Sequence, residues 1–380
     1  MNPATNNPAS AGFTRKARAL VIVLVSTLIT GCTGYYLQAV AGQAALMNAR
    51  RPIEEVLADP ATPPGLRQRL LAADSALLFA RLSLGLPSSG SYRHYADLGR
   101  PYVVWNVVAA PEFSLEPREW CYPVAGCASY RGWFSEARAS GEAAALAARG
   151  YDVFVGGVPA YSTLGWFADP LLNTMFHHDD AGVAGLLFHE LAHQKVYVSG
   201  DTAFNEGFAS FVEEEGTRRW LVSRNDADGL CRFEQRLARR AEVLGILGEL
   251  RTGLAAIYAS TVPVEQRREA RAAAFERARA AYAALRAGWD RPPWFDSWFA
   301  PGLNNARLAA LLTYEEQVPA FRALLALEGG NLERFYARVE ALSHASADER
   351  EQLLRRLGPP TDAPPVSVSA AAGSGCRDGY

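Results

Sequence analysis

The chain has 380 residues, of which 49% are hydrophobic and 21% are charged, and its formal net charge is −2. This length and composition are those of an ordinary globular protein, and they exclude a fibrous or wholly disordered molecule. Residues 1–31 contain three of the 38 basic residues and none of the 40 acidic residues, so the rest of the chain has a net charge of −5. No basic surplus remains that would favour nucleic acid as a partner.

The amino-terminal segment has the features of an export signal. A basic cluster at 15–18 precedes an apolar run at 19–30, which is shorter than the roughly 20 residues of a membrane-spanning helix. The run ends in Leu-Ile-Thr-Gly-Cys at 28–32, which resembles the bacterial lipobox, in which the chain is cleaved before a cysteine that then carries lipid. We therefore expect 1–31 to be a lipoprotein signal peptide and Cys32 to be lipidated. An uncleaved anchor and a generic signal peptide are the alternatives.

The residue after Cys32 bears on the location of the protein. It is Thr33 rather than Asp, and in the bacterial sorting pattern the absence of Asp favours the outer membrane, if the source is Gram-negative. We therefore expect a lipid-anchored protein of the bacterial cell envelope that faces the periplasm.

Residues 32–89 are predicted to form a helical segment. Apolar residues recur with the helical period at 36–43 and 51–57, and a Pro-rich break at 59–65 separates them from a longer amphipathic helix at 66–86. We interpret this segment as framework.

Residues 90–357 are predicted to form the main domain, which begins with a small mixed β-sheet. Stretches of β-branched and aromatic residues, bounded by Gly and Pro, predict strands at Tyr102–Val108 and Tyr151–Val158. A helix is predicted between them at 136–149.

The second half of the chain is predicted to be mostly helical. From 203 to 358 it is rich in Ala, Leu, Glu and Arg, with breaks at 225–229, 261–263 and 290–305. The tail at 358–380 is rich in Pro, Ser, Ala and Gly and is predicted to be disordered.

The cysteines agree with export. Cys121 and Cys127 enclose a Pro and a Gly, which suits a tight loop closed by a disulfide in an oxidising compartment. A structural zinc knuckle is the alternative, but no second Cys or Cys/His pair lies nearby. Cys231 and Cys376 could form a second disulfide.

The most informative stretch is an H-E-x-x-H motif inside an apolar run at 185–194. On a helix, His189 and His193 lie one turn apart on one face, so both imidazoles can bind one metal ion with Glu190 beside them. The surrounding apolar residues cover most of the helix, which predicts that it is buried. Buried His and Glu side chains need partners, and a zinc ion would supply one.

A catalytic zinc site needs a third protein ligand and an open position for water. Glu206 follows His193 by thirteen residues, and Asp201 or Thr202 can cap a second helix whose first turns carry Glu206. We therefore predict Glu206 as the third ligand. The competing candidates are Glu213, Asp201, His177 and His178.

This arrangement predicts a hydrolytic mechanism. Zinc lowers the pKa of its bound water from 15.7 to about 7 and polarises a substrate carbonyl. Glu190 would take the proton from the water and pass it to the leaving amine. The oxyanion of the tetrahedral intermediate needs a hydrogen-bond donor, for which Tyr161 and Tyr314 are the candidates.

The stretch Tyr161–Phe167 has two interpretations. In H-E-x-x-H proteases a small sheet precedes the metal-binding helix, and its edge strand holds the substrate backbone by strand addition. The stretch is either this edge strand or an aromatic-rich loop packed on the core.

These features together resemble a family, the bacterial putative aminopeptidases, which are predicted zinc-dependent exported lipoproteins. The resemblance covers nearly the whole chain after Cys32. Its motifs are Gly-Tyr-Tyr-Leu-Gln-Ala at 34–39, the two cysteines followed by Ser-Tyr-Arg-Gly-Trp-Phe at 129–134, Val-Pro-Ala-Tyr-Ser-Thr-Leu-Gly at 158–165, the H-E-x-x-H motif, Phe-Asn-Glu-Gly-Phe-Ala at 204–209 and Asn-Asn-Ala-Arg at 304–307.

The resemblance implies an α+β fold, a mainly helical gluzincin-like metallopeptidase with a small mixed sheet before the motif helix. It implies that His189, His193 and Glu206 bind Zn²⁺ and that Glu190 is the catalytic acid and base. Peptides are the implied substrates.

One departure concerns the way the substrate is held. In better-known zinc aminopeptidases a Gly-x-Met-Glu-Asn motif supplies a Glu that binds the substrate α-amine, and residues 156–162 contain no acid. Glu213, Asp169 and Asp152 are the candidates for this role. We expect cleavage at the amino terminus of short peptides. An envelope endopeptidase and a non-catalytic, metal-stabilised scaffold are the alternatives, and the sequence does not indicate an oligomeric state.

Overall fold

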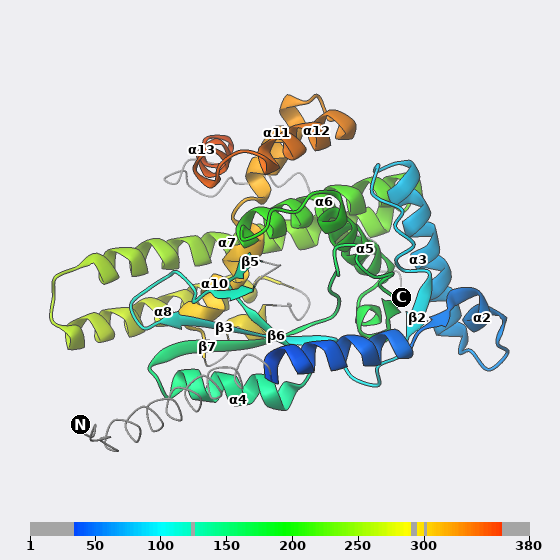
Figure 1. The fold of residues 1–380 in the computed structure, drawn as a ribbon. Helices are drawn as coiled ribbons and strands as arrows, with labels where there is room; N and C mark the ends of the chain where they lie inside the picture. Colours follow the sequence, from blue (N-terminus) through cyan, green and yellow to red (C-terminus); the bar gives the residue numbers. More distant parts are fainter. Residues whose placement is uncertain (1–33, 123–125, 290–294, 300–301, 359–380) are drawn as a thin grey trace, which may run out of the picture. The chain divides into compact units, whose positions relative to one another are not determined.

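The computed structural model describes residues 34–122, 126–289, 295–299 and 302–358 (Figure 1). The chain divides into two compact units, residues 1–49 and residues 50–380. In the first unit, residues 34–48 are helical. Within the described ranges, no helix is both long enough and apolar enough to cross a membrane. The predicted lipidation site Cys32, the half-cystine candidate Cys376 and the tail at 359–380 lie outside these ranges.

The second unit is mostly helical with small sheets, in agreement with the expected α+β class. Its main sheet is antiparallel, with β3 (Val104–Pro111) between β6 (Arg131–Trp133) and β7 (Tyr151–Val158). The prediction for β7 is confirmed at both ends, whereas β3 begins two residues later than predicted and continues to Pro111. The long pairing of β3 with β7 runs from Val104–Val158 to Pro111–Tyr151.

The main sheet is covered by a helix on each face. Trp105, Val107 and Ala109 of β3 pack with α4 (Glu136–Ala147), while Val108 and Ala110 pack with α10 (Asn305–Glu315). This alternation follows from the two-residue period of a strand. Because both faces are buried, β3 has no polar face and is an almost continuous apolar run.

Two further small sheets accompany the main one. The first is mixed: β2 (His94–Ala96) lies between β1 (Arg51–Pro52), which is antiparallel to it, and β8 (Leu171–Leu172), which is parallel to it. The second pairs β4 (Trp120–Tyr122) with β5 (Gly126–Ala128), and the expected disulfide joins Cys121 to Cys127.

The stretch Tyr161–Phe167 is a loop without strand pairing, so its interpretation as an edge strand is wrong. Leu164 and Gly165 have φ angles of 56° and 81°, which a strand does not contain. The alternative of a core-packed loop holds only in part, because Trp166 is 78% exposed and Phe167 is 49% exposed.

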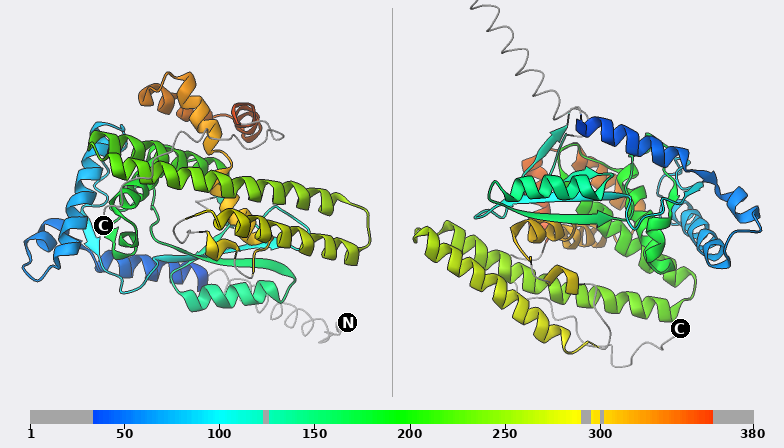
Figure 2. Two further views of the ribbon diagram at one scale, coloured as in Figure 1. Left: turned by 180° about the vertical axis from the view of Figure 1, so that it is seen from behind. Right: turned by 90° about the horizontal axis from the view of Figure 1, so that it is seen from below.

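The helical half surrounds a central pair, α5 (Asp180–Lys195) and α6 (Thr202–Ser223), which lie side by side (Figures 1 and 2). Two long helices, α7 (Ala227–Ala259) and α8 (Val264–Arg286), form an antiparallel hairpin around a separate apolar core. The other helices are α2 (Ile53–Ala58), α3 (Pro64–Leu82), the 3₁₀ helix η1 (Asn173–His177), α9 (Asp296–Phe299), α11 (Val318–Leu327), α12 (Leu332–Ser343) and α13 (Ala347–Leu357).

Candidate functional site

Helix α5 carries the motif histidines and is buried along most of its length. Its amino terminus is capped by Asp179, whose carboxylate accepts a hydrogen bond from the Gly182 amide at 2.8 Å and binds Arg236 of α7 at 2.8 Å. His189 and His193 are 8% and 9% exposed. The cap and the flanking apolar contacts therefore hold both imidazoles in the interior.

Helix α6 brings Glu206 to the same place. Asp201 is its N-cap, as predicted, and accepts a hydrogen bond from the Phe204 amide at 3.1 Å. Glu206 lies in the second turn and is 6% exposed. Phe204 and Phe208 on the same helix are fully buried against Phe321 of α11, which fixes the face that α6 turns toward α5.

The three predicted ligands form a compact triangle. Nε2 of His189 lies 3.2 Å from Nε2 of His193 and 3.3 Å from Oε2 of Glu206, and the His193–Glu206 distance between these atoms is 3.6 Å. Ligand atoms around a tetrahedral zinc ion at about 2.0–2.1 Å are about 3.3 Å apart. The side chains therefore fit a zinc ion without rearrangement, and they are the only buried cluster of potential ligands among the described residues.

The charges of this cluster compensate one another. Burial alone would raise the pKa of Glu206, but His193 and His189 lower it to about 2. Burial alone would lower the pKa of His189, but hydrogen bonds with Glu206 and Glu213 raise it to about 10. Without a metal ion, the proton on the His189 imidazole supplies the positive charge that balances the carboxylates. A divalent cation would supply that charge in place of the proton.

Glu213, the first competitor for the third ligand position, contacts His189 from the opposite side. Its Oε2 lies 3.1 Å from Nδ1 of His189, so Glu213 orients the ring and leaves Nε2 free for a metal. Gly185 makes this approach possible, because a Cβ at that position would lie 3.1 Å from Cγ of Glu213.

The other competitors have different positions. Asp201 caps α6 and binds Arg350 of α13 at 2.8 Å. His177 ends η1 and His178 follows it, and neither belongs to the ligand cluster.

Glu190 is 6% exposed and lies beside the ligand cluster without belonging to it. Its Oε2 has no hydrogen-bond partner among the described residues. Burial raises the pKa of Glu190, and the nearby carboxylates of Glu206 and Asp169 act in the same direction against the two histidines. A buried, unpaired carboxylate next to three metal ligands is a suitable general base.

The two predicted tyrosines belong to different elements of the fold. The ring of Tyr314 in α10 stacks on His189, with 6.3 Å between centroids. Tyr161 follows β7 and packs edge-on against Phe134; burial raises its pKa, with further contributions from Asp169 and Glu190.

Sequence reasoning missed two other tyrosines. Burial raises the pKa of Tyr130, and the charge of Glu206 raises it further. Tyr197 packs edge-on against His193 at 6.3 Å. Tyr197 is four residues after His193, a spacing that places two residues on one face of a helix. This spacing does not explain the contact, because α5 ends at Lys195.

The three acids considered for binding the substrate amine already have partners. Asp152 pairs with Arg271 and accepts the Asn305 amide. Asp169 is 4% exposed and accepts the amide and hydroxyl of Thr163. Glu213 contacts His189, so none of the three is a free carboxylate in the site.

The Asn-Asn motif of α10 does not face the cluster. Asn304 caps α10 and donates to the carbonyl of Val153 in β7, while Asn305 donates to the carbonyls of Pro111 and Glu112 at the end of β3. These bonds attach α10 to the sheet and thereby place Tyr314.

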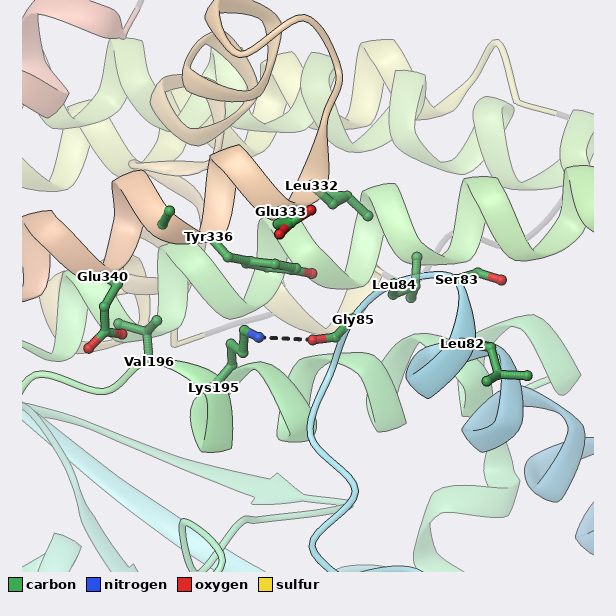
Figure 3. Close-up of a pocket in the computed structure, with 11 residues that line it drawn as sticks. Leu82, Ser83, Leu84, Gly85, Lys195, Val196, Leu332, Glu333, Tyr336 and Glu340 are labelled. Carbon is green, nitrogen blue, oxygen red and sulfur yellow. Dashed lines mark hydrogen bonds between the residues drawn. The ribbon is translucent and has the colours of Figure 1, made fainter.

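A cavity of about 630 Å³ lies apart from the ligand cluster, between the carboxy-terminal ends of α3 and α5 and one face of α12. Figure 3 shows Lys195 in this cavity, where its ammonium donates to the carbonyl of Gly85 at 3.0 Å and lies over the ring of Tyr336. None of His189, His193 and Glu206 lines it.

A family model described as "Putative aminopeptidase" matches residues 34–354. No curated protein and no solved structure matches the chain with significant similarity.

Proposed function

The chain belongs to the putative aminopeptidase family, and from this premise we propose that it is a zinc-dependent peptidase that cleaves residues from the amino terminus of peptides. The observation that carries the proposal is the triangle of His189, His193 and Glu206 with the buried Glu190 beside it. Two histidines and a glutamate with an open fourth position are a donor set of catalytic zinc. A gluzincin-like fold is part of the proposal.

His189 and His193 would hold the zinc ion through Nε2, and Glu206 through its carboxylate. When bound, zinc lowers the pKa of a coordinated water to about 7 and polarises the scissile carbonyl. Glu213 fixes the tautomer of His189 by accepting from Nδ1. A structural zinc site would have four protein ligands, and the described cluster has three, which favours catalysis over a scaffold role.

Glu190 is the residue that moves the proton. Its Oε2 is unpaired and buried, so it can accept a proton from water and return it to the leaving amine. Because burial raises the pKa of Glu190, its carboxylate is a stronger base than an exposed glutamate.

Tyr314 is the proposed donor to the oxyanion. Its ring stacks on His189, and burial, followed by the charge of Glu206, raises its pKa, so the hydroxyl stays protonated at neutral pH. Tyr161 is the second candidate, on the side of Glu190.

An endopeptidase is the second candidate function. An aminopeptidase must bind the substrate ammonium group, and Asp152, Asp169 and Glu213 are each bonded to other groups. An endopeptidase has no such requirement.

The proposed location is the outer membrane of a bacterial cell, facing the periplasm, with lipid on Cys32. The basic cluster, the short apolar run and the Leu-Ile-Thr-Gly-Cys sequence at 28–32 support this proposal.

The test compares the parent protein with Glu190→Gln. We expect both to bind about one zinc ion per chain and only the parent to hydrolyse peptides, with a loss of about 10²–10⁴-fold or more in kcat for the variant. Zinc is measured by elemental analysis, and hydrolysis with amino-acid naphthylamides and with amino-blocked peptides.

The blocked peptides distinguish the two peptidase activities. Cleavage of free amino termini alone supports the aminopeptidase, and cleavage of blocked peptides supports the endopeptidase. Zinc binding without any hydrolysis by the parent would favour a metal-stabilised scaffold.

A further inference from the structure

A short connector, residues 196–201, joins the two helices that carry the ligands. It begins directly after α5, three residues from His193, and ends at the N-cap of α6, five residues before Glu206. Its position therefore sets how far apart the two helices hold His193 and Glu206. Tyr197, whose ring packs against His193, belongs to the same connector.

Side chains of two helices, Asn205 of α6 and Arg350 of α13, hold the connector in place. The side chain of Asn205 donates to the carbonyl of Val198 and accepts from its amide, both at 2.8 Å. Asp201 binds the guanidinium of Arg350 through two bonds of 3.0 Å and 2.8 Å. The turn at Ser199–Gly200 lies between these two anchor points.

The β4–β5 hairpin packs against this turn. A Cβ built on Gly126 would lie 2.7 Å from the Gly200 amide nitrogen and 2.7 Å from Oγ of Ser199. Contact this close is possible only for a residue without a side chain, and the φ of +77° at Gly126 also favours glycine. The hairpin backbone thus lies directly on the connector backbone.

The disulfide fixes the hairpin at this point. Cys121 and Cys127 face each other in the register of β4 and β5, and Cys127 is the neighbour of Gly126. The chain continues from Cys127 to Tyr130, which packs with Val108 and Ala110 of β3. One short disulfide-linked element therefore contacts the connector between the two helices that carry the candidate ligands.

We propose that the disulfide-linked strand pair of β4 and β5 positions the metal centre by bracing the connector at Ser199–Gly200, so that opening the Cys121–Cys127 bond weakens metal binding. The inference rests on the proposed function, because it assigns the brace to the zinc ligands. Gly126 is a positioning residue and touches no substrate. The consequence is a metal site whose affinity depends on the redox state of a disulfide outside it.

The first test compares Gly126→Ala with Gly150→Ala in the full-length chain. Both glycines have left-handed φ angles, +77° and +83°, but no atom lies within 4 Å of a Cβ at Gly150. In both variants the alanine must adopt a positive φ, so both have the same kind of backbone strain. Only the new Cβ of Gly126→Ala would collide with the connector. We expect Gly126→Ala to bind Zn²⁺ at least about tenfold more weakly than Gly150→Ala, in competition with a chromophoric chelator.

Two readouts distinguish positioning from general destabilisation. We expect the Co²⁺-substituted Gly126→Ala protein to have an altered visible absorption spectrum, and the amides of 196–201 to exchange hydrogen faster than in Gly150→Ala. Equal zinc affinity and equal spectra for the two variants would overturn the proposal.

The second test opens the disulfide and does not depend on the folding of Gly126→Ala. A water-soluble phosphine converts the S–S bond to two thiols and becomes the phosphine oxide, with its oxygen from water. We expect it to weaken Zn²⁺ binding by the parent and by Cys231→Ala. Cys231 is itself disulfide-bonded, so the Cys231→Ala variant shows whether reduction at Cys231 contributes to the effect. We expect the phosphine to have no further effect on the double variant Cys121→Ala/Cys127→Ala, which should bind Zn²⁺ weakly even before the phosphine is added.

The outcomes separate this inference from the proposed function. If the parent binds zinc tightly and the phosphine or the double substitution leaves its affinity unchanged, the brace is wrong and the peptidase proposal stands. If the oxidised parent binds no zinc, both are wrong.

Discussion

His189 uses both of its ring nitrogens. Nε2 faces His193 and Glu206, while Nδ1 contacts Oε2 of Glu213 at 3.1 Å. A carboxylate on the second nitrogen fixes the tautomer in which Nε2 carries the lone pair that a metal needs. Glu213 is therefore part of the candidate site although it does not belong to the cluster of potential ligands.

Replacing Glu213 by Ala is expected to weaken zinc binding by about 10–100-fold, because the His189 ring loses the group that orients it. The measurement is competition with a chromophoric chelator. Glu215→Ala is the matched control, since Glu215 lies on the same helix but pairs with Arg218 and Arg219. Equal zinc affinities for the two variants would remove Glu213 from the site.

Among individual residues, the sequence already indicated the three side chains that the fold brings together, and it also indicated Glu213. Glu213 follows Glu206 by seven residues, two helical turns, so both carboxylates lie on one face of α6. Helical spacing cannot tell which of the two reaches Nε2 and which reaches Nδ1. That choice depends on how α6 packs beside α5, and Gly185 admits Glu213 at the outer position.

At the level of elements, the stability of α5 depends on the charge of its N-cap residue, Asp179. Burial alone would raise the pKa of Asp179, but Arg236 and the Gly182 amide lower it from its ordinary value of 3.8. A lowered pKa in the folded state stabilises the protein above pH 3.8, and this contribution is lost as the pH falls through the folded value.

Asp179→Asn tests this charge, since Asn caps a helix about as well as Asp. We expect the variant to be less stable than the parent at pH 7 and the difference to shrink as the pH falls below 3.8. Urea unfolding of the metal-free proteins at pH 7 and at a series of acidic pH values measures it. Asp180→Asn, which leaves the Arg236 pair intact, is the control. A difference that stays constant with pH would show that the charge contributes nothing.

Helix α6 is held by an aromatic cluster. Phe211 is 1% exposed, and its ring lies 5.1 Å from that of Phe335 in α12. Phe211→Ala is expected to lower the free energy of unfolding by about 3–5 kcal/mol through lost burial and the cavity left behind. Val222→Ala on the same helix, 57% exposed, should change it by less than about 0.5 kcal/mol. Similar losses for both would contradict the packing described for α6.

The loop at Tyr161–Phe167 shows why the strand interpretation failed. Its composition, Tyr-Ser-Thr-Leu-Gly-Trp-Phe, is rich in aromatic residues and contains Thr, and these residue types are common in strands. Thr163 instead bonds to Asp169 through its amide and hydroxyl, and this closes a turn between residues six positions apart. Local composition contains no information on a partner that only the folded chain brings close.

At the level of the whole molecule, the proposed lipid anchor determines where the peptidase acts. Cys32→Ala is expected to remain unlipidated and to partition into the aqueous phase after detergent extraction, because the acyl chains are lost. Labelled palmitate and phase partitioning measure this, with Cys231→Ala as the control that should still be labelled. Incorporation of palmitate into Cys32→Ala would contradict the lipobox interpretation.

The sequence by itself determined the main helices, two of the strands and the candidate ligands. The helical period indicated α5 and α6, β-branched runs indicated β3 and β7, and the spacing of His189, His193 and Glu206 indicated the cluster. These signals are local, because they depend on periodicity and on caps within a few residues.

Only the tertiary structure decided how these elements meet. It placed Glu213 beside Nδ1 of His189, stacked the ring of Tyr314 on His189, and packed Gly126 against Ser199–Gly200. Each of these contacts joins residues far apart in the chain. Their cause is the packing of buried faces, which depends on the shape of both partners and leaves no periodic pattern in either segment.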